Sequence, residues 1–600
     1  MRSVYHVRDF RLITDKYHVK TIYEEYFPEN LIFWRVAMFT FFHTYTEDTF
    51  EGLFRQNLFR EGDGLKMAHT MYMPQSYKFN EAARPGIPLY ERVKSLGCPF
   101  YIDRLQGGIP FTHWYAYDPE LIDQWKEMLG DNFCGFQIHE WASNYNCCDR
   151  GHVQKLYDDA GTHDPTPEQK KAIWDAVRNG EKKIWIEAMY PDEWAAHRLP
   201  MSQRECIDDL YMLYSRRREM ASGNLIPADS FYMAPRIEIE NGSKMLLPEV
   251  GWQIPGMRIQ MAYTRAQAEI GGARWGIYYE CWGYSEKYRS LMIPLSLCDT
   301  QDEWLMNLLR YGAGASDSTM EERERGGSSR NLQERAWRYA YLSGATAMGE
   351  EYGVCTTFRN TRDFDLSPYG QVKHDFLRFT ERFSEIGRPY TPVAVVLPAE
   401  MPVVDVMLRT PYLDYPYRGS EDLIPDAQMD TIRETMALLF GTGRKYGNHS
   451  HVICNSSYPD IFDIIHADQT DAIARYDYLI DLTGDPAFAQ AHSNCVVAEA
   501  LSAMLDTLLP FHVDGDLHTM YNRTADGWLL LIMNNEGILI KDFSGDIQMP
   551  EAAIDGRLHH LCGEWKLLDS NTAEPQKTDD GCTFTLGGGE WMLLGISCDN

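Results

Sequence analysis

The chain has 600 residues, too many for one ordinary hydrophobic core, so we expect two to four domains. It carries 57 Lys and Arg against 87 Asp and Glu, a formal net charge of −30. Because phosphate recognition needs clustered cations, this balance argues against nucleic acid or an anionic membrane as the main partner and favours a small ligand.

The amino terminus, MRSVYHVRDFRLITDKYHV, has scattered charges and no apolar stretch of signal-peptide length, so we expect a cytoplasmic protein without a membrane anchor. Thirteen cysteines, an odd number and often inside apolar runs, fit reduced buried thiols better than disulfides. Only Cys147 and Cys148 with His152 resemble a ligand cluster. Adjacent cysteines do not easily share one tetrahedral zinc, so no metal is expected there.

Short apolar runs alternate along the first two thirds of the chain with segments of helical period. We expect strands at residues 36–42, 65–72, 99–103, 135–140, 183–188, 230–235, 275–280 and 345–350. Clear helical patterns lie between them at residues 118–130, 166–180, 202–220 and 331–344. Eight strand and helix units predict an α/β fold, a (β/α)8 TIM barrel.

Active sites of that fold lie at the carboxyl ends of the strands. The polar and aromatic residues expected at or just after those ends are His43, Asp103, Arg104, His139, Glu140, Trp141, Asn144, Glu187, Arg236, Glu280, Trp282, Glu350 and Glu351.

A structural role is the main alternative for most of these residues. A single glutamate after a strand is more often a helix cap or an ion-pair partner, which applies to Glu187, Glu350 and Glu351. Arg104 and Arg236 could simply neutralise nearby carboxylates. His43 and His139 suit orienting roles or contacts with sugar hydroxyls better than metal binding.

Glu140 and Glu280 stand out because they end the predicted fourth and seventh strands, which face each other across a barrel mouth. Two facing carboxyl groups suit glycoside cleavage, in which one protonates the departing oxygen and the other attacks the anomeric carbon. A retaining double displacement needs the two groups about 5 to 5.5 Å apart. Trp141 and Trp282 could shield the pair and stack on the sugar, although 13% aromatic residues are also typical of a large aromatic core.

These glutamates resemble the catalytic pair of clan A retaining glycoside hydrolases, and the segments 366–379 and 387–398 look like a domain junction of family 42 β-galactosidases and related β-mannosidases. The resemblance implies that Glu140 is the acid/base and Glu280 the nucleophile of an exo-β-glycosidase without a cofactor. It also implies a homo-oligomer, a trimer or dimer. His139 departs from the pattern, because those enzymes usually carry Asn before the acid/base, where it contacts the 2-hydroxyl.

The resemblance divides the chain into a catalytic barrel (1–385), a flavodoxin- or amidotransferase-like α/β domain used in oligomerisation (386–515) and a small C-terminal β-sandwich (516–600). The residues alone agree with this division. Continuous apolar strands at 393–398, 451–455 and 476–484 predict a covered parallel sheet, without a nucleotide-binding motif. Beyond Leu517, paired strands with an Asp526-Gly527 turn predict an antiparallel sandwich, which either binds sugar or only packs.

The segment 311–331 is rich in glycine, serine and charge, and it is either a surface loop or a lid over the barrel mouth. Two other classes of function remain open. A non-catalytic sugar-binding or scaffold protein would keep the aromatic cleft and tolerate the loss of either glutamate. A metal-dependent barrel hydrolase would use His43, His139 and acidic strand ends as ligands, although the predicted barrel, residues 1–385, contains no HxH or HExxH spacing.

Overall fold

The structure is a computed structural model that divides into two compact units, Met1–Met38 and Phe39–Asn600. All the described residues lie in the second unit. They are residues 39–47, 49–67, 79–103, 117–139, 141–142, 158–162, 166, 168–169, 172–173, 176, 181, 202–229, 232–251, 256–280, 330–351, 353–358, 362–401, 422–441, 452–536, 538–542, 545–548, 552–559 and 563–598.

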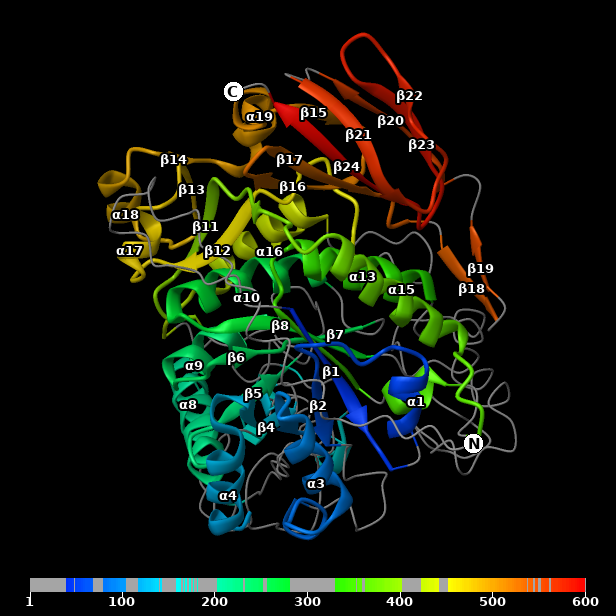
Figure 1. The fold of residues 1–600 in the computed structure, drawn as a ribbon. Coiled ribbons are helices and arrows are strands. Elements are labelled where there is room, and N and C mark those ends of the chain that lie inside the picture. Colours follow the sequence, from blue (N-terminus) through cyan, green and yellow to red (C-terminus); the bar gives the residue numbers. More distant parts are fainter. Residues whose placement is uncertain are drawn as a thin grey trace, which may run out of the picture. The chain divides into compact units, whose positions relative to one another are not determined.

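A parallel sheet of nine recorded strands forms a nearly closed barrel (Figure 1). Its strands are β1 (Thr40–Tyr45), β2 (Gly64–Met67), β3 (Phe100–Ile102), β4 (Phe133–His139), β5 (Leu225–Ala228), β6 (Met245–Leu246), β7 (Glu249–Gly251), β8 (Arg274–Glu280) and β9 (Ala347–Glu351). They pair in the order β5-β4-β3-β2-β1-β9-β8-β6, and β7 also pairs with β8. Since β6 and β7 are two parts of one interrupted strand, the barrel has eight strand positions, as predicted.

Two backbone hydrogen bonds connect the edges of this sheet. Leu247 N donates to Pro227 O and Glu249 N donates to Asp229 O, both over 2.9 Å. They link β5 to the β6/β7 strand. The barrel order therefore makes β4 the fourth strand and β8 the seventh.

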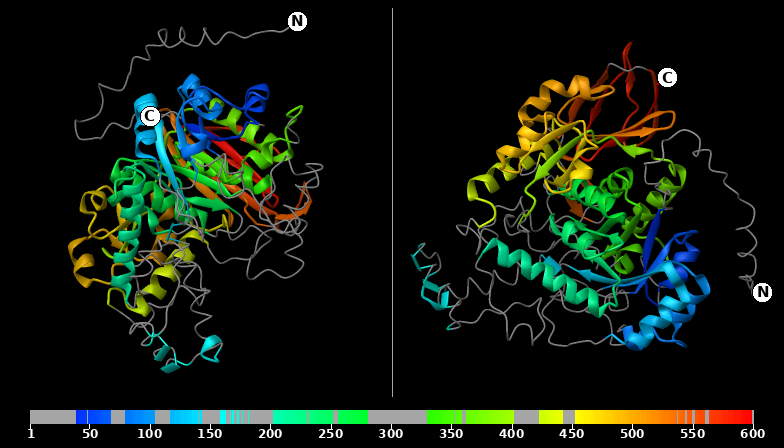
Figure 2. Two further views of the ribbon diagram at one scale, coloured as in Figure 1. Left: turned by 90° about the horizontal axis from the view of Figure 1, so that it is seen from below. Right: turned by 90° about the vertical axis from the view of Figure 1, so that its left-hand side faces the viewer.

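Helices connect the strands and cover the outside of the barrel (Figures 1 and 2). They are α1 (Phe50–Arg55), α2 (Phe79–Ala82), α3 (Pro88–Leu96), α4 (Pro119–Leu129), α8 (Gln203–Met220), α9 (Ala234–Glu240), α10 (Met257–Gly271), α13 (Arg330–Leu342), α14 (Gly353–Thr357) and α15 (Pro368–Arg382). Local sequence sets their ends. The Asp118 side chain accepts from Glu120 N and the Ser202 side chain accepts from Glu205 N, which places the starts of α4 and α8.

One predicted barrel strand is wrong, and another lies outside the described residues. The position after β4 belongs to β5, which pairs with β4 from Phe136 beside Leu225 to His139 beside Ala228. Residues 183–188, predicted as the fifth strand, all lie outside the described residues. The predicted sixth strand, 230–235, instead contains a turn and the start of α9. Pro227 hid β5 in the sequence, because proline seldom occurs inside a sheet.

A second, parallel sheet follows the barrel, with strand order β12-β11-β13-β14. Its strands and helices are β11 (Val393–Leu397), α16 (Asp426–Phe440), β12 (Phe462–His466), α17 (Thr470–Ile473), β13 (Tyr478–Asp481), α18 (Pro486–Ala491), β14 (Cys495–Val496) and α19 (Leu501–Leu508). The expected strand at 451–455 is wrong, because its described residues form no strand and β12 takes that position. Asp463 interrupts the apolar run of β12 and weakened its signal.

The C-terminal region is antiparallel, with sheets ordered β10-β16-β17-β24-β21 and β15-β20-β23-β22 and a separate β18-β19 pair. The strands are β10 (Arg388–Pro389), β15 (His512–Asp514), β16 (His518–Thr524), β17 (Gly527–Met533), β18 (Ile538–Asp542), β19 (Gly545–Gln548), β20 (Ile554–His559), β21 (Gly563–Ser570), β22 (Gln576–Lys577), β23 (Cys582–Leu586) and β24 (Trp591–Cys598). The predicted hairpin at Asp526-Gly527 joins β16 to β17. Among the helices of the described ranges, none has the length and apolar character needed to cross a membrane.

Candidate active site at the barrel mouth

Polar side chains gather inside the barrel near the carboxyl ends of its strands. Neighbouring residues of a strand face opposite sides, and Phe42, Tyr101 and Tyr278 belong to the apolar cluster inside the barrel. The strand register then places further residues on the same inner side. They are Lys66, Asp103, His139, Glu249, Glu280 and Glu351. All six side chains are buried, so the described part of the barrel mouth contains at least four carboxyl groups beside a lysine and a histidine.

Glu280 is the last residue of β8, and the adjoining strands make room for its side chain. Its register partners are Gly251 in β7 and Glu351 in β9. A Cβ atom added to Gly251 would lie 2.4 Å from Glu280 Cβ and 2.7 Å from Glu280 Oε2. Both distances are shorter than van der Waals contact. The glycine at position 251 therefore allows the glutamate carboxylate to occupy this part of the barrel.

His139 lies between two of the carboxyl groups. Its Nε2 atom is 3.6 Å from Glu249 Oε1 and 3.5 Å from Glu351 Oε1. One ligand atom from each of the three residues lies within 4.8 Å of the others. Such a set can share a proton or bind a cation, because packed like charges need a positive partner.

Lys66 and Tyr278 position Asp103 on the other side of the mouth. Lys66 Nζ lies 2.5 Å from Asp103 Oδ2, and Tyr278 OH donates to the same oxygen over 2.9 Å. The ammonium group also lies 3.1 Å from Tyr278 OH. These contacts fix one carboxylate oxygen of Asp103 in a buried, hydrogen-bonded position.

His43 and Glu350, both expected at the mouth, face outward instead. His43 Nε2 lies 3.3 Å from Asp63 Oδ2, and Glu350 Oε2 lies 2.5 Å from Lys373 Nζ in α15. Burial lowers the pKa of His43 to about 4, and the charge on Lys373 acts in the same direction. A neutral His43 and a paired Glu350 support the packing between strands and helices. Each of them is next in its strand to a residue that faces the inside of the barrel.

Arg236 does not follow a strand either. It lies in α9, where Arg236 Nη2 is 2.7 Å from Asp468 Oδ2 and Arg236 Nε is 2.9 Å from Glu240 Oε1. These ion pairs connect a barrel helix to the loop after β12. The expected position of Arg236 after the sixth strand is therefore wrong, whereas its contact with a ligand stays a prediction.

Trp141 is buried rather than presented to a ligand. Its ring packs against Tyr214 with centroids 4.9 Å apart, and its Nε1 donates to Glu238 Oε1 over 2.8 Å. Burial raises the pKa of Glu238 well above its ordinary value, and the nearby charge of Asp229 adds to this effect. The ring thus connects the segment after β4 to helices α8 and α9, and the expected stacking of Trp141 on a sugar stays a prediction.

Five expected site residues and residues 311–329 of the segment 311–331 lie outside the described residues, whereas Arg330 and Asn331 begin α13. The residues are Arg104, Glu140, Asn144, Glu187 and Trp282. Glu140 nevertheless follows the last residue of β4 directly. Asp103, His139, Glu280 and Glu351, by contrast, are all brought to the inner side of the mouth.

The sequence interpretation missed several inner residues of the described strands, among them Lys66, Glu249 and Tyr278. Lys66 is the only charged residue of β2, and Glu249 begins β7 within the run MLLPEVG. A charged residue inside a short apolar run was the available signal. The wrong sixth strand hid Glu249, because its segment was left between predicted elements.

The fold and site together define a barrel protein with a buried carboxyl cluster at the strand ends. No protein-family profile and no curated protein matches the chain. Solved structures that match include a rhamnosidase from Novosphingobium sp. PP1Y, with 8% identity, 81% of this chain and 48% of that chain covered, and a TM-score of 0.31. The chain thus spans about half the length of the rhamnosidase.

Two α-amylases also match. The one from H. orenii has 9% identity over 94% of this chain and 100% of its own, with a TM-score of 0.25. The one from Geobacillus thermoleovorans, complexed with acarbose, has 9% identity over 94% and 99%, with a TM-score of 0.21. At these scores the barrel assignment rests on strand pairing and not on the neighbours.

Proposed function

We propose that this chain is a retaining β-glycosidase that removes a terminal β-linked galactose or mannose from a small oligosaccharide or glycoside without a cofactor. The observation that carries the proposal is the inward, buried position of Glu280 at the end of the seventh barrel strand. Glu140 directly follows the fourth strand. Strand ends of this fold are where catalytic groups lie.

In the proposed reaction, Glu280 attacks the anomeric carbon while Glu140 gives its proton to the departing glycosidic oxygen. This forms an ester between sugar and Glu280 and releases the leaving group as an alcohol. Glu140 then removes a proton from water, and the resulting attack breaks the ester and restores both carboxyl groups. Asp103 and His139 supply hydrogen-bonding groups for sugar hydroxyls.

The arrangement of charged groups at the mouth supports the role proposed for Glu280. Asp103 already has Lys66 as a close cationic partner at 2.5 Å. Glu249, Glu280 and Glu351 occupy one buried region together with His139. Full ionisation of several buried carboxyl groups is unfavourable, so such a region can keep one acid protonated beside an ionised nucleophile.

The activity can be tested with a panel of nitrophenyl glycosides. We expect turnover of a β-galactoside or β-mannoside, with the β-anomer as the first product seen by NMR, since two inversions retain configuration. An α-anomer as first product would contradict the double displacement. Binding of sugars without any turnover would instead favour a non-catalytic sugar-binding protein.

Glu140→Ala should lower kcat/KM by about 10²- to 10⁴-fold for substrates with poor leaving groups, because the departing oxygen loses its proton donor. Activated aryl glycosides should suffer less in the first step. Azide should then restore turnover by attacking the ester without a general base, giving a glycosyl azide that mass spectrometry detects. Full activity of the purified variant would remove Glu140 from the mechanism.

Gly251→Ala should lower kcat/KM about 100-fold, because a new Cβ 2.4 Å from Glu280 Cβ must displace the nucleophile. Steady-state kinetics on the best nitrophenyl glycoside measures the effect. Gly97→Ala is the control, since nothing lies within 4 Å of its added Cβ. That change strains the backbone at a helix end but adds no atom near the mouth. Equal losses of kcat/KM in both variants would therefore argue that displacement of Glu280 is not the cause.

The cluster of His139, Glu249 and Glu351 favours a metal-dependent barrel hydrolase as a second candidate function. One imidazole and two carboxylates are a donor set that divalent metals accept. Activity that is lost with a chelator, regained with added metal and lost in His139→Asn would support this candidate. Chelator-resistant activity that depends on Glu280 would support the double displacement.

A further inference from the structure

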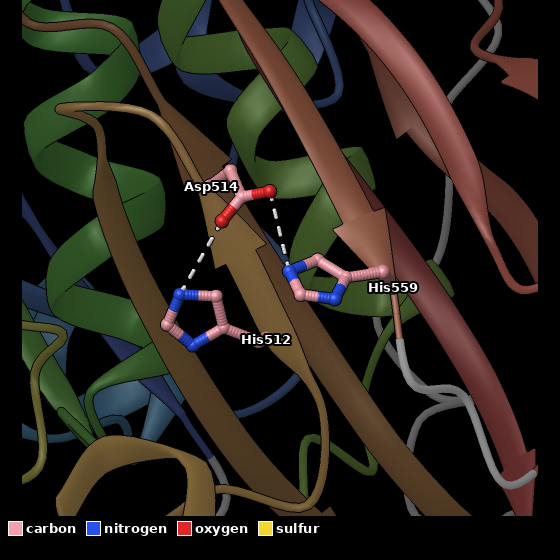
Figure 3. A group of neighbouring side chains, drawn as sticks. All are labelled: His512, Asp514 and His559. Carbon is pink, nitrogen blue, oxygen red and sulfur yellow. Dashed lines mark ion pairs between the residues drawn. The ribbon is translucent and has the colours of Figure 1, made fainter. Parts of the chain in front are cut away.

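A second cluster of ligand-type side chains lies far along the chain, on the antiparallel sheet that contains β15 and β20. His512 and His559 are direct cross-strand partners in this sheet. Asp514 stands two residues after His512, which places it on the same face. Figure 3 shows the two imidazole rings turned toward the Asp514 carboxylate.

We propose that His512, Asp514 and His559 bind a divalent transition-metal ion, with Zn²⁺ as the best fit. His512 Nε2 lies 3.6 Å from Asp514 Oδ1, and His559 Nε2 lies 3.3 Å from Asp514 Oδ2. Ligands about 2.0–2.1 Å from a tetrahedral zinc are about 3.3 Å from each other. The two nitrogen-to-oxygen separations are close to this value but involve different oxygens of Asp514, and one ligand atom from each of the three residues lies within 4.8 Å of the others. Zinc binding therefore needs a rearrangement of the carboxylate that brings the three ligand atoms closer together.

The chemistry of the donors supports zinc over the harder cations. Two imidazoles and one carboxylate suit Zn²⁺, whereas Ca²⁺ and Mg²⁺ prefer sets made of oxygen. Partly exposed side chains, with 25% of His512 and 16% of His559 accessible, leave a path for the ion and for water as a fourth ligand.

Asp506 provides an independent feature of such a site. Its Oδ1 lies 3.7 Å from Nδ1 of His512, on the side of the ring opposite the proposed ion. Metal-bound histidines commonly direct their second ring nitrogen to a carboxylate, which orients the ring and strengthens the ligand. At 3.7 Å the Asp506 carboxylate makes no hydrogen bond to this nitrogen, so it would have to move closer to act in this way. Asp506 lies in α19, so the ion would also fasten this helix to the sheet.

The test is calorimetric titration of the chelator-treated, dialysed full chain with ZnCl₂. Wild type should bind Zn²⁺, and His512→Asn and His559→Asn should each weaken that event by about 100-fold or more. Asp514→Asn is the second test, because it keeps the shape of an exposed side chain and removes the charge. The melting temperature should rise with Zn²⁺ in wild type and not in these variants.

Two controls separate this site from other histidines. His374→Asn removes a half-exposed imidazole that faces one carboxylate, Asp375, at 3.2 Å, and should leave Zn²⁺ binding unchanged. His139→Asn removes the ring inside the barrel, and the event assigned to His512 should persist in it. Binding lost in His139→Asn but kept in His512→Asn, or no binding up to about 100 μM Zn²⁺, would overturn the proposal.

Discussion

Replacing Glu280 with glutamine should abolish hydrolysis, with kcat/KM falling by about 10⁴-fold or more, which corresponds to at least about 5.5 kcal/mol of lost transition-state stabilisation. The amide keeps the shape of the side chain in its buried place beside Gly251, but it cannot form the sugar ester. Initial rates on activated aryl glycosides measure the loss. Circular dichroism of the purified variant checks that the fold is kept.

Glu350→Gln is a matched control for this change. Glu350 precedes Glu351 in β9 and is as buried as Glu280, but it faces Lys373 on the outer side of the barrel. Its replacement should lower stability and leave the activity of the folded protein nearly unchanged. Similar losses of activity in both variants would mean that packing, and not the chemistry of Glu280, explains the result.

Covalent labelling can identify the nucleophile directly. A 2-deoxy-2-fluoro glycoside with a good leaving group forms the ester quickly and hydrolyses slowly, because the fluorine destabilises both positively charged transition states. Peptide mapping should find the label on Glu280. A label on Glu249 or Glu351 would keep the double displacement and move the attacking role to that residue.

Strand positions in the barrel followed from the sequence where apolar runs were long and continuous. The runs that form β4 and β8 each have seven residues, and the fourth and seventh positions predicted for them are confirmed. The four-residue β5 contains Pro227, and the strand at the sixth position is broken into β6 and β7. Short or interrupted runs give too little periodicity to distinguish a strand from a turn.

The inner and outer faces of the strands were harder to predict than their ends. Both faces of a parallel barrel strand are buried, so its sequence lacks the alternation that marks one face. His43 and Glu350 therefore looked equivalent to His139 and Glu351, although the register places the first pair outward and the second pair inward. Only pairing across several strands distinguishes the two groups.

Contacts between segments far apart in the chain also could not be predicted from the sequence. Arg258 in α10 is 1% exposed, and its Nε donates to Asp460 Oδ1 over 2.7 Å. The other carboxylate oxygen lies 2.6 Å from Nε2 of His518 in β16. One carboxylate thus joins a barrel helix, the segment before β12 and the C-terminal sheet, over sequence separations of 202 and 58 residues.

This carboxylate also makes stability depend on pH. Burial alone would raise the pKa of Asp460, but the charges of Arg258 and His518 lower it below its ordinary value of 3.8. A lowered pKa in the folded state means that the stabilisation is present above about pH 4 and is lost as pH falls further. Acid unfolding curves should show this loss in wild type and a smaller one in Asp460→Asn.

Asp460→Asn should reduce the free energy of unfolding by about 3–5 kcal/mol, because the buried Arg258 guanidinium loses its counter-charge. Guanidinium chloride unfolding followed by tryptophan fluorescence measures the change. Arg475→Ala is the control: it breaks the pair of Arg475 with Glu269, also made by α10 but 44% and 40% exposed. An exposed pair of this kind contributes at most about 1 kcal/mol.

The double variant Arg258→Met/Asp460→Asn separates charge from packing. If the single variant is unstable because one charge is left uncompensated, removal of the second charge should recover part of the loss. If the two changes add instead, the loss comes from the separate hydrogen bonds that Arg258 makes to Tyr458 O at 2.9 Å and Asp460 makes to His518. Recovery in the double variant would show that each charge of the ion pair is needed mainly to compensate the other. A methionine at position 258 would then fill the same space at this junction with apolar atoms.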